Sequence, residues 1–163
     1  MVQKAGIRWL TRTAILLAIA LVIQMGGFPQ FITGPLVNTV LYLSAMIVGW
    51  QGGVLIGLCT PLIAALRGIL PPPLTPMIPF IALGNGILVI LFFYLGSKNK
   101  ILGIVFASLV KFLILVLAVN FLVQVPPAVA QMMSFPQLIT ALVGGFIALL
   151  AVRVLKTSGL NIF

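Results

Sequence analysis

The sequence has no acidic side chain and no histidine: among its 163 residues there is no Asp, no Glu and no His. The chain therefore has no carboxylate pair, no catalytic triad and no Asp, Glu or His relay for protons. A P-loop motif is also missing, so we do not expect this chain to hydrolyse ATP. Its one cysteine, Cys59, provides neither a disulfide framework nor metal-ligand spacing. These absences predict a protein that is not an enzyme and that holds no metal or cofactor.

Charged residues of any kind are scarce, and apolar residues are abundant. Only 6% of the residues are charged, 63% are hydrophobic, and the mean hydropathy is +1.36. Such values lie outside the range of soluble domains and predict an integral membrane protein. Because one crossing takes about 20 apolar residues, the chain has room for about six. We expect a single all-α membrane domain over residues 1–163, with spans near 13–28, 36–49, 53–70, 77–96, 101–123 and 135–155.

The net charge of +9 comes from nine Lys and Arg residues, most of which fall beside the expected spans. A nucleic-acid partner would need a solvated basic face, which scattered charges in an apolar chain do not form. Lys and Arg accumulate instead in the cytoplasmic connections of membrane proteins. In a six-span topology this rule places both termini in the cytoplasm. Seven of the nine charges follow it: Lys4, Arg8, Arg12, Lys98, Lys100, Arg153 and Lys156.

Lys111 and Arg67 are the two exceptions. Lys111 falls at the middle of the fifth expected span, where an ionisable side chain is costly and usually faces the bundle interior or a cavity. Arg67 ends the third span, near the outer membrane surface. Both residues have a structural alternative, in which the long stem carries the charge along the helix to the headgroups. For Lys111 a further alternative is a neutral side chain buried in the bundle. If both bind a ligand, that ligand is an anion, because the protein has no acid to compete with it.

Uncharged polar side chains gather toward the outer ends of the spans, where the prolines also concentrate and predict stiff loops. Aromatic rings and adaptable thioethers surround these amides. Mostly apolar walls with a few polar groups are typical of small-molecule pockets, although amides also bond between membrane helices. We predict that Asn38, Asn85, Asn120 and Gln137 bind a ligand, together with Lys111 and Arg67, and that Phe31, Met77, Phe80, Met133 and Phe135 line the pocket.

Depth separates Asn120 from Lys111 on the fifth span. The two residues are nine positions apart, which amounts to about 14 Å along a helix. Asn120 therefore lies at the level of the other amides. Lys111 reaches the pocket only if its side chain extends upward from the pocket floor, so on depth alone Asn120 is the stronger candidate.

Two six-residue stretches, Phe28–Thr33 and Phe135–Thr140, are nearly identical. One match of this length does not establish an internal repeat. We interpret the stretches as two similar turns, each of which places a Gln near the rim of a pocket.

Ala14 and Ala18 in the first span form a small-xxx-small pattern, which lets another helix backbone approach closely. Gly53 with Gly57 has the same spacing, as does Ala141 with Gly145. By spacing alone, the pattern therefore indicates packing within the bundle more than a partner.

With these features the chain resembles a substrate-binding S component of an energy-coupling factor (ECF) vitamin transporter. The resemblance covers nearly the whole length in size, six spans, inner termini and short inner turns. It also rests on the Ala14/Ala18 pattern and on the stretches Gly34–Asn38 and Pro76–Asn85.

The resemblance implies a multi-pass subunit of a bacterial cell membrane that captures a vitamin-like micronutrient from outside with high affinity. Such a subunit docks through its first span against a transmembrane coupling subunit, and two cytoplasmic ATPases drive the toppling that presents the pocket inward. In this sequence Ala14 and Ala18 would be the docking residues. By position, Asn38, Arg67, Asn85, Asn120 and Gln137 would belong to the pocket.

The ligand itself is not fixed by the resemblance. Basic residues without acids, beside Phe and Met side chains, favour an anion with an apolar body, such as a lipoate-like or biotin-like carboxylate. The lack of acids argues against a cation such as thiamine, and the lack of His argues against a metal ion. Two alternatives from other classes are a self-contained oligomeric facilitator or channel, with Lys111 and Arg67 along an anion path, and a membrane scaffold without a ligand.

Overall fold

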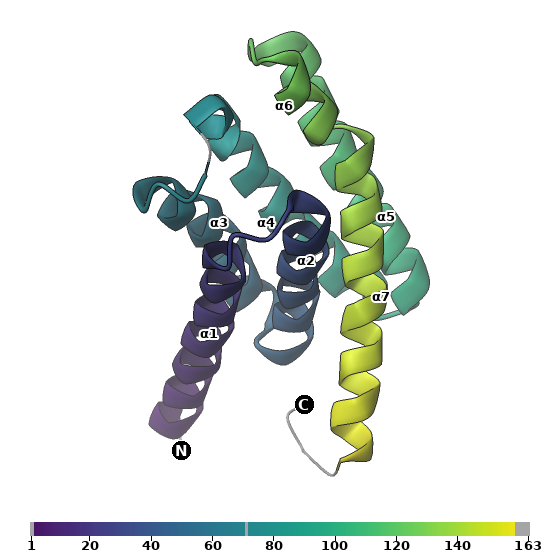
Figure 1. The fold of residues 1–163 in the computed structure, drawn as a ribbon. Helices are drawn as coiled ribbons and strands as arrows, with labels where there is room; N and C mark the ends of the chain where they lie inside the picture. Colours follow the sequence, from purple (N-terminus) through teal and green to yellow (C-terminus); the bar gives the residue numbers. More distant parts are fainter. Residues whose placement is uncertain (1, 71, 159–163) are drawn as a thin grey trace.

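The structure, a computed structural model, describes residues 2–70 and 72–158, and these residues form helices joined by short connections (Figure 1). Six of the helical segments are long and apolar enough to cross a membrane. The prediction of an all-α membrane bundle with six spans is therefore confirmed. The elements are α1 (Val2–Met25), α2 (Gln30–Ile47), α3 (Gly49–Leu66), the 3₁₀ helix η1 (Pro72–Met77), α4 (Ile78–Gly96), α5 (Lys100–Leu117), the π-helical segment η2 (Ala118–Leu122), α6 (Pro127–Met132) and α7 (Phe135–Thr157).

The helix ends differ from the expected spans in ways that local chemistry explains. Gly27 has a φ of +66°, a left-handed conformation that ends a helix, so Phe28 lies in the connection after α1. Pro35 lies inside α2 rather than before it, so the helix begins at Gln30 and includes residues expected in the connection. The short helix α6 is additional to the predicted spans and lies in the connection between η2 and α7.

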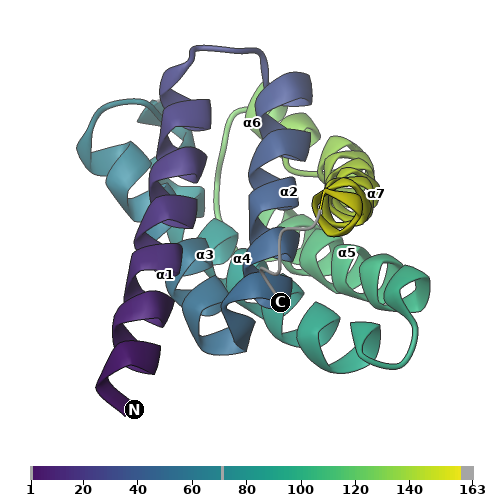
Figure 2. The same ribbon diagram turned by 90° about the horizontal axis from the view of Figure 1, so that it is seen from below.

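Helix α2 is the centre of the bundle and packs against α1, α3, α4 and α7 (Figures 1 and 2). Its Tyr42 is fully buried, and the Tyr42 hydroxyl lies 2.8 Å from Ser108 Oγ on α5. The ring of Tyr42 also meets Phe92 of α4 edge to face, with the centroids 4.8 Å apart. These contacts fix α2, α4 and α5 relative to one another, so residues on the three helices can form one site.

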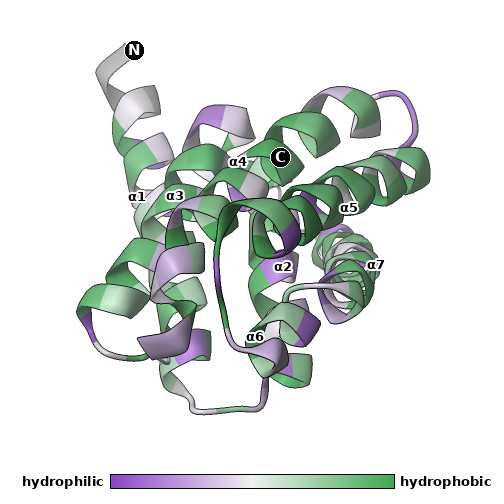
Figure 3. Cartoon of the chain, turned by 90° about the horizontal axis from the view of Figure 1, so that it is seen from above, coloured by the Kyte–Doolittle hydropathy of each residue, from purple (hydrophilic) through white to green (hydrophobic). Residues whose placement is uncertain are grey.

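The two ends of the bundle differ in character. One end, the terminal end, holds the first turns of α1, the last turns of α7 and the turns between α2 and α3 and between α4 and α5. Hydrophobic residues cover most of α5, whereas the α4–α5 turn is hydrophilic (Figure 3). The opposite end, the pocket end, holds the longer connections and α6. A second apolar cluster, built on Leu74, Met77, Leu115, Ala118, Val129 and Met133, supports the pocket end.

Candidate functional site

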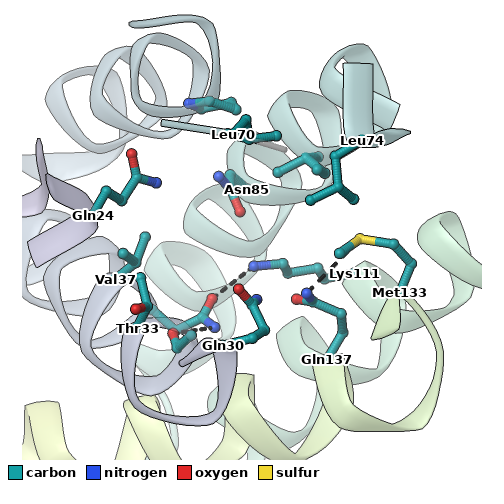
Figure 4. A pocket seen from close by; sticks show the side chains of 14 residues that line it. Gln24, Gln30, Thr33, Val37, Leu70, Leu74, Asn85, Lys111, Met133 and Gln137 are labelled. Atoms are coloured by element: carbon teal, nitrogen blue, oxygen red, sulfur yellow. Dashed lines mark hydrogen bonds between the residues drawn. The ribbon is translucent and has the colours of Figure 1, made fainter. Parts of the chain in front are cut away.

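A cavity of about 100 Å³, the inner cavity, opens between the helices at the pocket end. Four of the six polar side chains predicted from the sequence line it: Asn38, Asn85, Lys111 and Gln137. They come from α2, α4, α5 and α7, and Figure 4 shows their helices converging around the cavity. All four side chains are buried. A buried cluster of one lysine amine and three side-chain amides is therefore the polar centre of this end of the protein.

Lys111 reaches the inner cavity through a hydrogen bond to α2. Its Nζ donates to Asn38 Oδ1 at 2.7 Å, and only 4% of the residue is exposed (Figure 4). The Nζ of a lysine carries more than one N–H donor, and among the described residues the bond to Asn38 is the one the structure gives it. The Asn38 amide is in turn oriented by its Nδ2, which donates to Gly34 O at 2.9 Å. The lysine thus lies on the pocket floor with donors for a further acceptor.

The other two amides are held less tightly. Asn85 Nδ2 donates to Gly57 O at 3.2 Å, and Gln137 Nε2 has Met133 Sδ as its acceptor at 3.9 Å. A thioether sulfur is a weak acceptor. A ligand oxygen in the inner cavity can therefore take the Gln137 N–H with little loss.

Glycines on the facing helices make room for these side chains. A Cβ at Gly144 of α7 would lie 2.6 Å from Asn38 Cβ, and one at Gly57 would lie 3.1 Å from Asn85 Cβ. A Cβ at Gly84 would lie 3.3 Å from Lys111 Cγ. The close approach that presents the polar side chains to the cavity thus depends on the absence of side chains at these three positions.

Replacing Gly144 by alanine is expected to destabilise the protein and to disturb the site. The added methyl group would overlap Asn38 and the Pro35 carbonyl, and overpacking of this kind costs about 1–3 kcal/mol. Gly86→Ala is the matched control, because a Cβ there would have its nearest neighbours at 3.8 Å. Thermal unfolding in detergent should show a lowered midpoint for Gly144→Ala alone; equal midpoints for both variants would contradict the close packing of α7 on α2.

A second and larger cavity, the outer cavity, lies beside the inner one and has a volume of about 510 Å³. The two cavities share five lining residues, Gln24, Gln30, Thr33, Leu70 and Leu74. The remaining wall of the outer cavity is largely apolar and includes Met25, Phe28, Ala64, Ile69 and Met132. Together the cavities have the size of a small-molecule site, for which about 300–1,000 Å³ is usual.

Gln24 lies at the junction of the two cavities, near the end of α1 (Figure 4). Its Oε1 is buried, and no donor among the described residues reaches it. An unpaired buried acceptor is unfavourable. The Gln24 amide is therefore a group that a bound molecule can reorient at low cost.

Arg67 and Asn120 line neither cavity. Arg67 is the exposed C-cap residue of α3. Asn120 is exposed on η2, where its Nδ2 donates to Val116 O at 2.8 Å. Nine helical positions turn a side chain by about 180°, so Asn120 shares the depth of the other amides but faces away from Lys111.

Of the five apolar residues predicted to line the pocket, one lines a cavity and four do not. Met133 is buried and lines the inner cavity. Met77 is fully buried in the second apolar cluster, and Phe80 packs against that cluster. Phe31 and Phe135 are exposed at the start of α2 and of α7. These four residues support or flank the pocket end without forming the wall of either cavity.

We expect Arg67→Gln and Asn120→Ala each to change ligand affinity by less than about twofold, since surface substitutions away from a site stay within about 0.5 kcal/mol. Equilibrium binding of the purified variants measures this. A loss of tenfold or more at either position would place that residue in the binding site, as the sequence alone predicted.

The cavities are also lined by residues that we did not predict as binding residues from the sequence: Gln24, Gln30 and Thr33, with the apolar Leu70 and Leu74. The two similar stretches of sequence carried part of this signal, because Gln30 and Gln137 occupy equivalent positions in them and both line the inner cavity. No comparable sequence pattern indicated Gln24.

Helix α1 is the least enclosed of the six spans, with 17% of its apolar window buried against 33–50% for the others. Ala14 and Ala18 lie on its exposed side, whereas Thr13, Leu16 and Ala20 face the bundle. The small-xxx-small pattern of α1 is therefore not used for packing within the described part of the chain.

The comparison with protein-family models matches residues 8–156 to the ECF transporter, substrate-specific component family. The chain belongs to this family. The resemblance inferred from the sequence is thus confirmed. Membership implies that this ECF component is a transport subunit and not an enzyme, that it captures a specific substrate, and that it works with other ECF components. Searches among curated proteins and among solved structures gave no match.

Proposed function

We propose that this ECF component captures a small vitamin-like anion with an apolar body in the paired cavities and delivers it through an ATP-driven complex. The observation that carries the proposal is the buried Lys111 on the floor of the inner cavity, hydrogen bonded to Asn38. A buried ammonium group favours an anion, and the sequence offers no acidic side chain in its place. A carboxylate of the lipoate or biotin type combines an acidic head group with an apolar body, as this site requires.

The described arrangement also supports a direction of uptake. The cavities lie at the end opposite the start of α1 and the end of α7, while Arg8, Arg12, Lys98, Lys100, Arg153 and Lys156 lie toward the terminal end. By the positive-inside rule the terminal end is cytoplasmic. The pocket end then faces the exterior of a bacterial cell membrane and receives the substrate from there.

The partners in this proposal are a transmembrane coupling subunit and two cytoplasmic ATPases. The coupling subunit docks on the exposed side of α1 at Ala14 and Ala18, where small side chains permit close helix contact. The energy for transport comes from the ATPases, because this chain has no P-loop.

Native mass spectrometry of the chain, purified from its own membranes in mild detergent, tests substrate capture. We expect a fraction of the protein to carry one small molecule that contains an acidic group, and we expect Lys111→Met to carry less of it. A retained molecule that is cationic, or wild-type protein that binds no compound from a vitamin and cofactor-acid library, would contradict the proposed function.

A further inference from the structure

The two cavities differ in chemistry as well as in size. The inner cavity is small and has the amides of Asn38, Asn85 and Gln137 around Lys111. The outer cavity is about five times larger, with a volume of about 510 Å³ against about 100 Å³, and the residues that line it alone are mostly apolar. A molecule that occupies both cavities has its polar group in the inner cavity and its apolar body in the outer cavity. This is because buried polar groups need hydrogen-bond partners, whereas buried apolar surface does not.

The site offers a single ionisable side chain. Among the described residues that line the two cavities, Lys111 alone can carry a charge, and Arg67 lies outside both linings. A protonated Lys111 beside a bound anion balances one negative charge, whereas a second anionic group would be desolvated without a partner. This arrangement selects a monoanion over a dicarboxylate or a phosphate monoester.

The inner cavity is also the smaller end of the site. Its volume is about 100 Å³, against about 510 Å³ for the outer cavity. A small polar head group therefore suits the inner cavity, and the bulkier part of a ligand lies beyond Gln24 and Gln30, which line both cavities.

We propose that the substrate is a monoanion that binds head first: its one acidic group lies at Lys111 and Asn38, and its apolar body extends through the outer cavity toward the α1–α2 connection. This inference rests on the proposed function and specifies the charge and the orientation of the ligand. It follows that changes at the acidic end abolish binding, whereas additions at the far end of the body are tolerated.

Three simple probes test the charge: octanoate, its uncharged amide octanamide and the dicarboxylate octanedioate, each added to the purified protein below its micelle concentration. We expect octanoate to raise the unfolding midpoint, and we expect the other two to bind at least about tenfold more weakly because one lacks the charge and the other carries an unpaired one. Lys111→Met should lose the octanoate effect. Lys98→Met, at an exposed lysine outside both cavities, is the matched control and should keep it.

A photoreactive monocarboxylate tests the orientation, with a diazirine at the end opposite the carboxylate. We expect cross-links, mapped by mass spectrometry, at outer-cavity residues such as Met25, Phe28 or Met132, and we expect octanoate to suppress them. Cross-links at Ile81 or Asn85, which line only the inner cavity, would overturn the head-first orientation.

The two proposals fail differently. Octanamide or octanedioate binding as well as octanoate, or no effect of octanoate, would overturn the monoanion inference. Whether the protein captures a substrate is tested separately from these probes. That test is the retained molecule in native mass spectrometry or the binding of a library compound.

Discussion

Replacing Lys111 by methionine is expected to weaken substrate binding about 100-fold, because truncating one partner of a buried charge pair costs about 2–5 kcal/mol and about 1.4 kcal/mol corresponds to a factor of ten. The substitution removes the ammonium group that faces the inner cavity and leaves Asn38 Oδ1 without its donor. Methionine has a stem of similar length, so the packing against Gly84 is retained. Equilibrium titration with the ligand identified by native mass spectrometry measures the effect.

Two comparisons make this result specific. Lys98→Met removes an equal charge from the exposed α4–α5 turn and should leave the affinity unchanged. The unfolding midpoint of Lys111→Met without ligand should stay near that of the wild type, because the cost of leaving Asn38 Oδ1 without a donor is offset by the removal of a buried ionisable group. An affinity within twofold of the wild type for a folded Lys111→Met protein would remove Lys111 from the site.

Replacing Ala14 and Ala18 together by tryptophan is expected to abolish assembly with the coupling subunit and the ATPases while substrate binding is retained. Both alanines lie on the exposed side of α1, and bulky rings there prevent a second helix from approaching closely. The only described residues of α1 that line the cavities are Gln24 and Met25, at the C-terminal end of the helix. Co-purification with the tagged coupling subunit should fall at least about tenfold, which corresponds to about 1.4 kcal/mol.

Ile19→Trp is the matched control for this variant. Ile19 is 44% exposed on the same helix, but it points about 100° around the axis from Ala18. It should keep most of the assembly. Undiminished co-purification of the Ala14/Ala18 double variant would exclude α1 as the docking helix.

The architecture followed from the sequence because the bilayer imposes simple rules. Hydropathy and span length predicted six crossings, and the described residues contain six helices that are long and apolar enough to cross a membrane. Local chemistry moved the boundaries: Gly27 ends α1 before Phe28, and Pro35 is accommodated within α2. The short helix α6 carries too few residues to stand out as a periodic signal in the sequence.

The polar centre of the pocket was predictable in part. Asn38, Asn85 and Gln137 were chosen by depth, and all three line the inner cavity. Depth alone could not distinguish Asn120, which lies at a similar level but on the outward face of η2. It also underrated Lys111, because the direction of a long side chain depends on a partner from another helix, here Asn38 on α2.

The remaining walls depend on tertiary structure. Leu70 follows the end of α3 and Leu74 lies in η1, and both residues line the two cavities. Glycines at positions 57, 84 and 144 determine how closely the helices approach behind the polar side chains. None of these features has a local pattern, since each depends on which helices become neighbours.

ATP-dependent uptake by reconstituted proteoliposomes tests the central claim most directly. The purified chain is compared with the same chain assembled with its coupling subunit and ATPases, using the ligand identified by native mass spectrometry. We predict that the chain alone binds the ligand without transporting it, and that transport appears only with the complete complex and ATP. Flux through the chain alone, independent of ATP, would contradict the account and would support a self-contained anion facilitator.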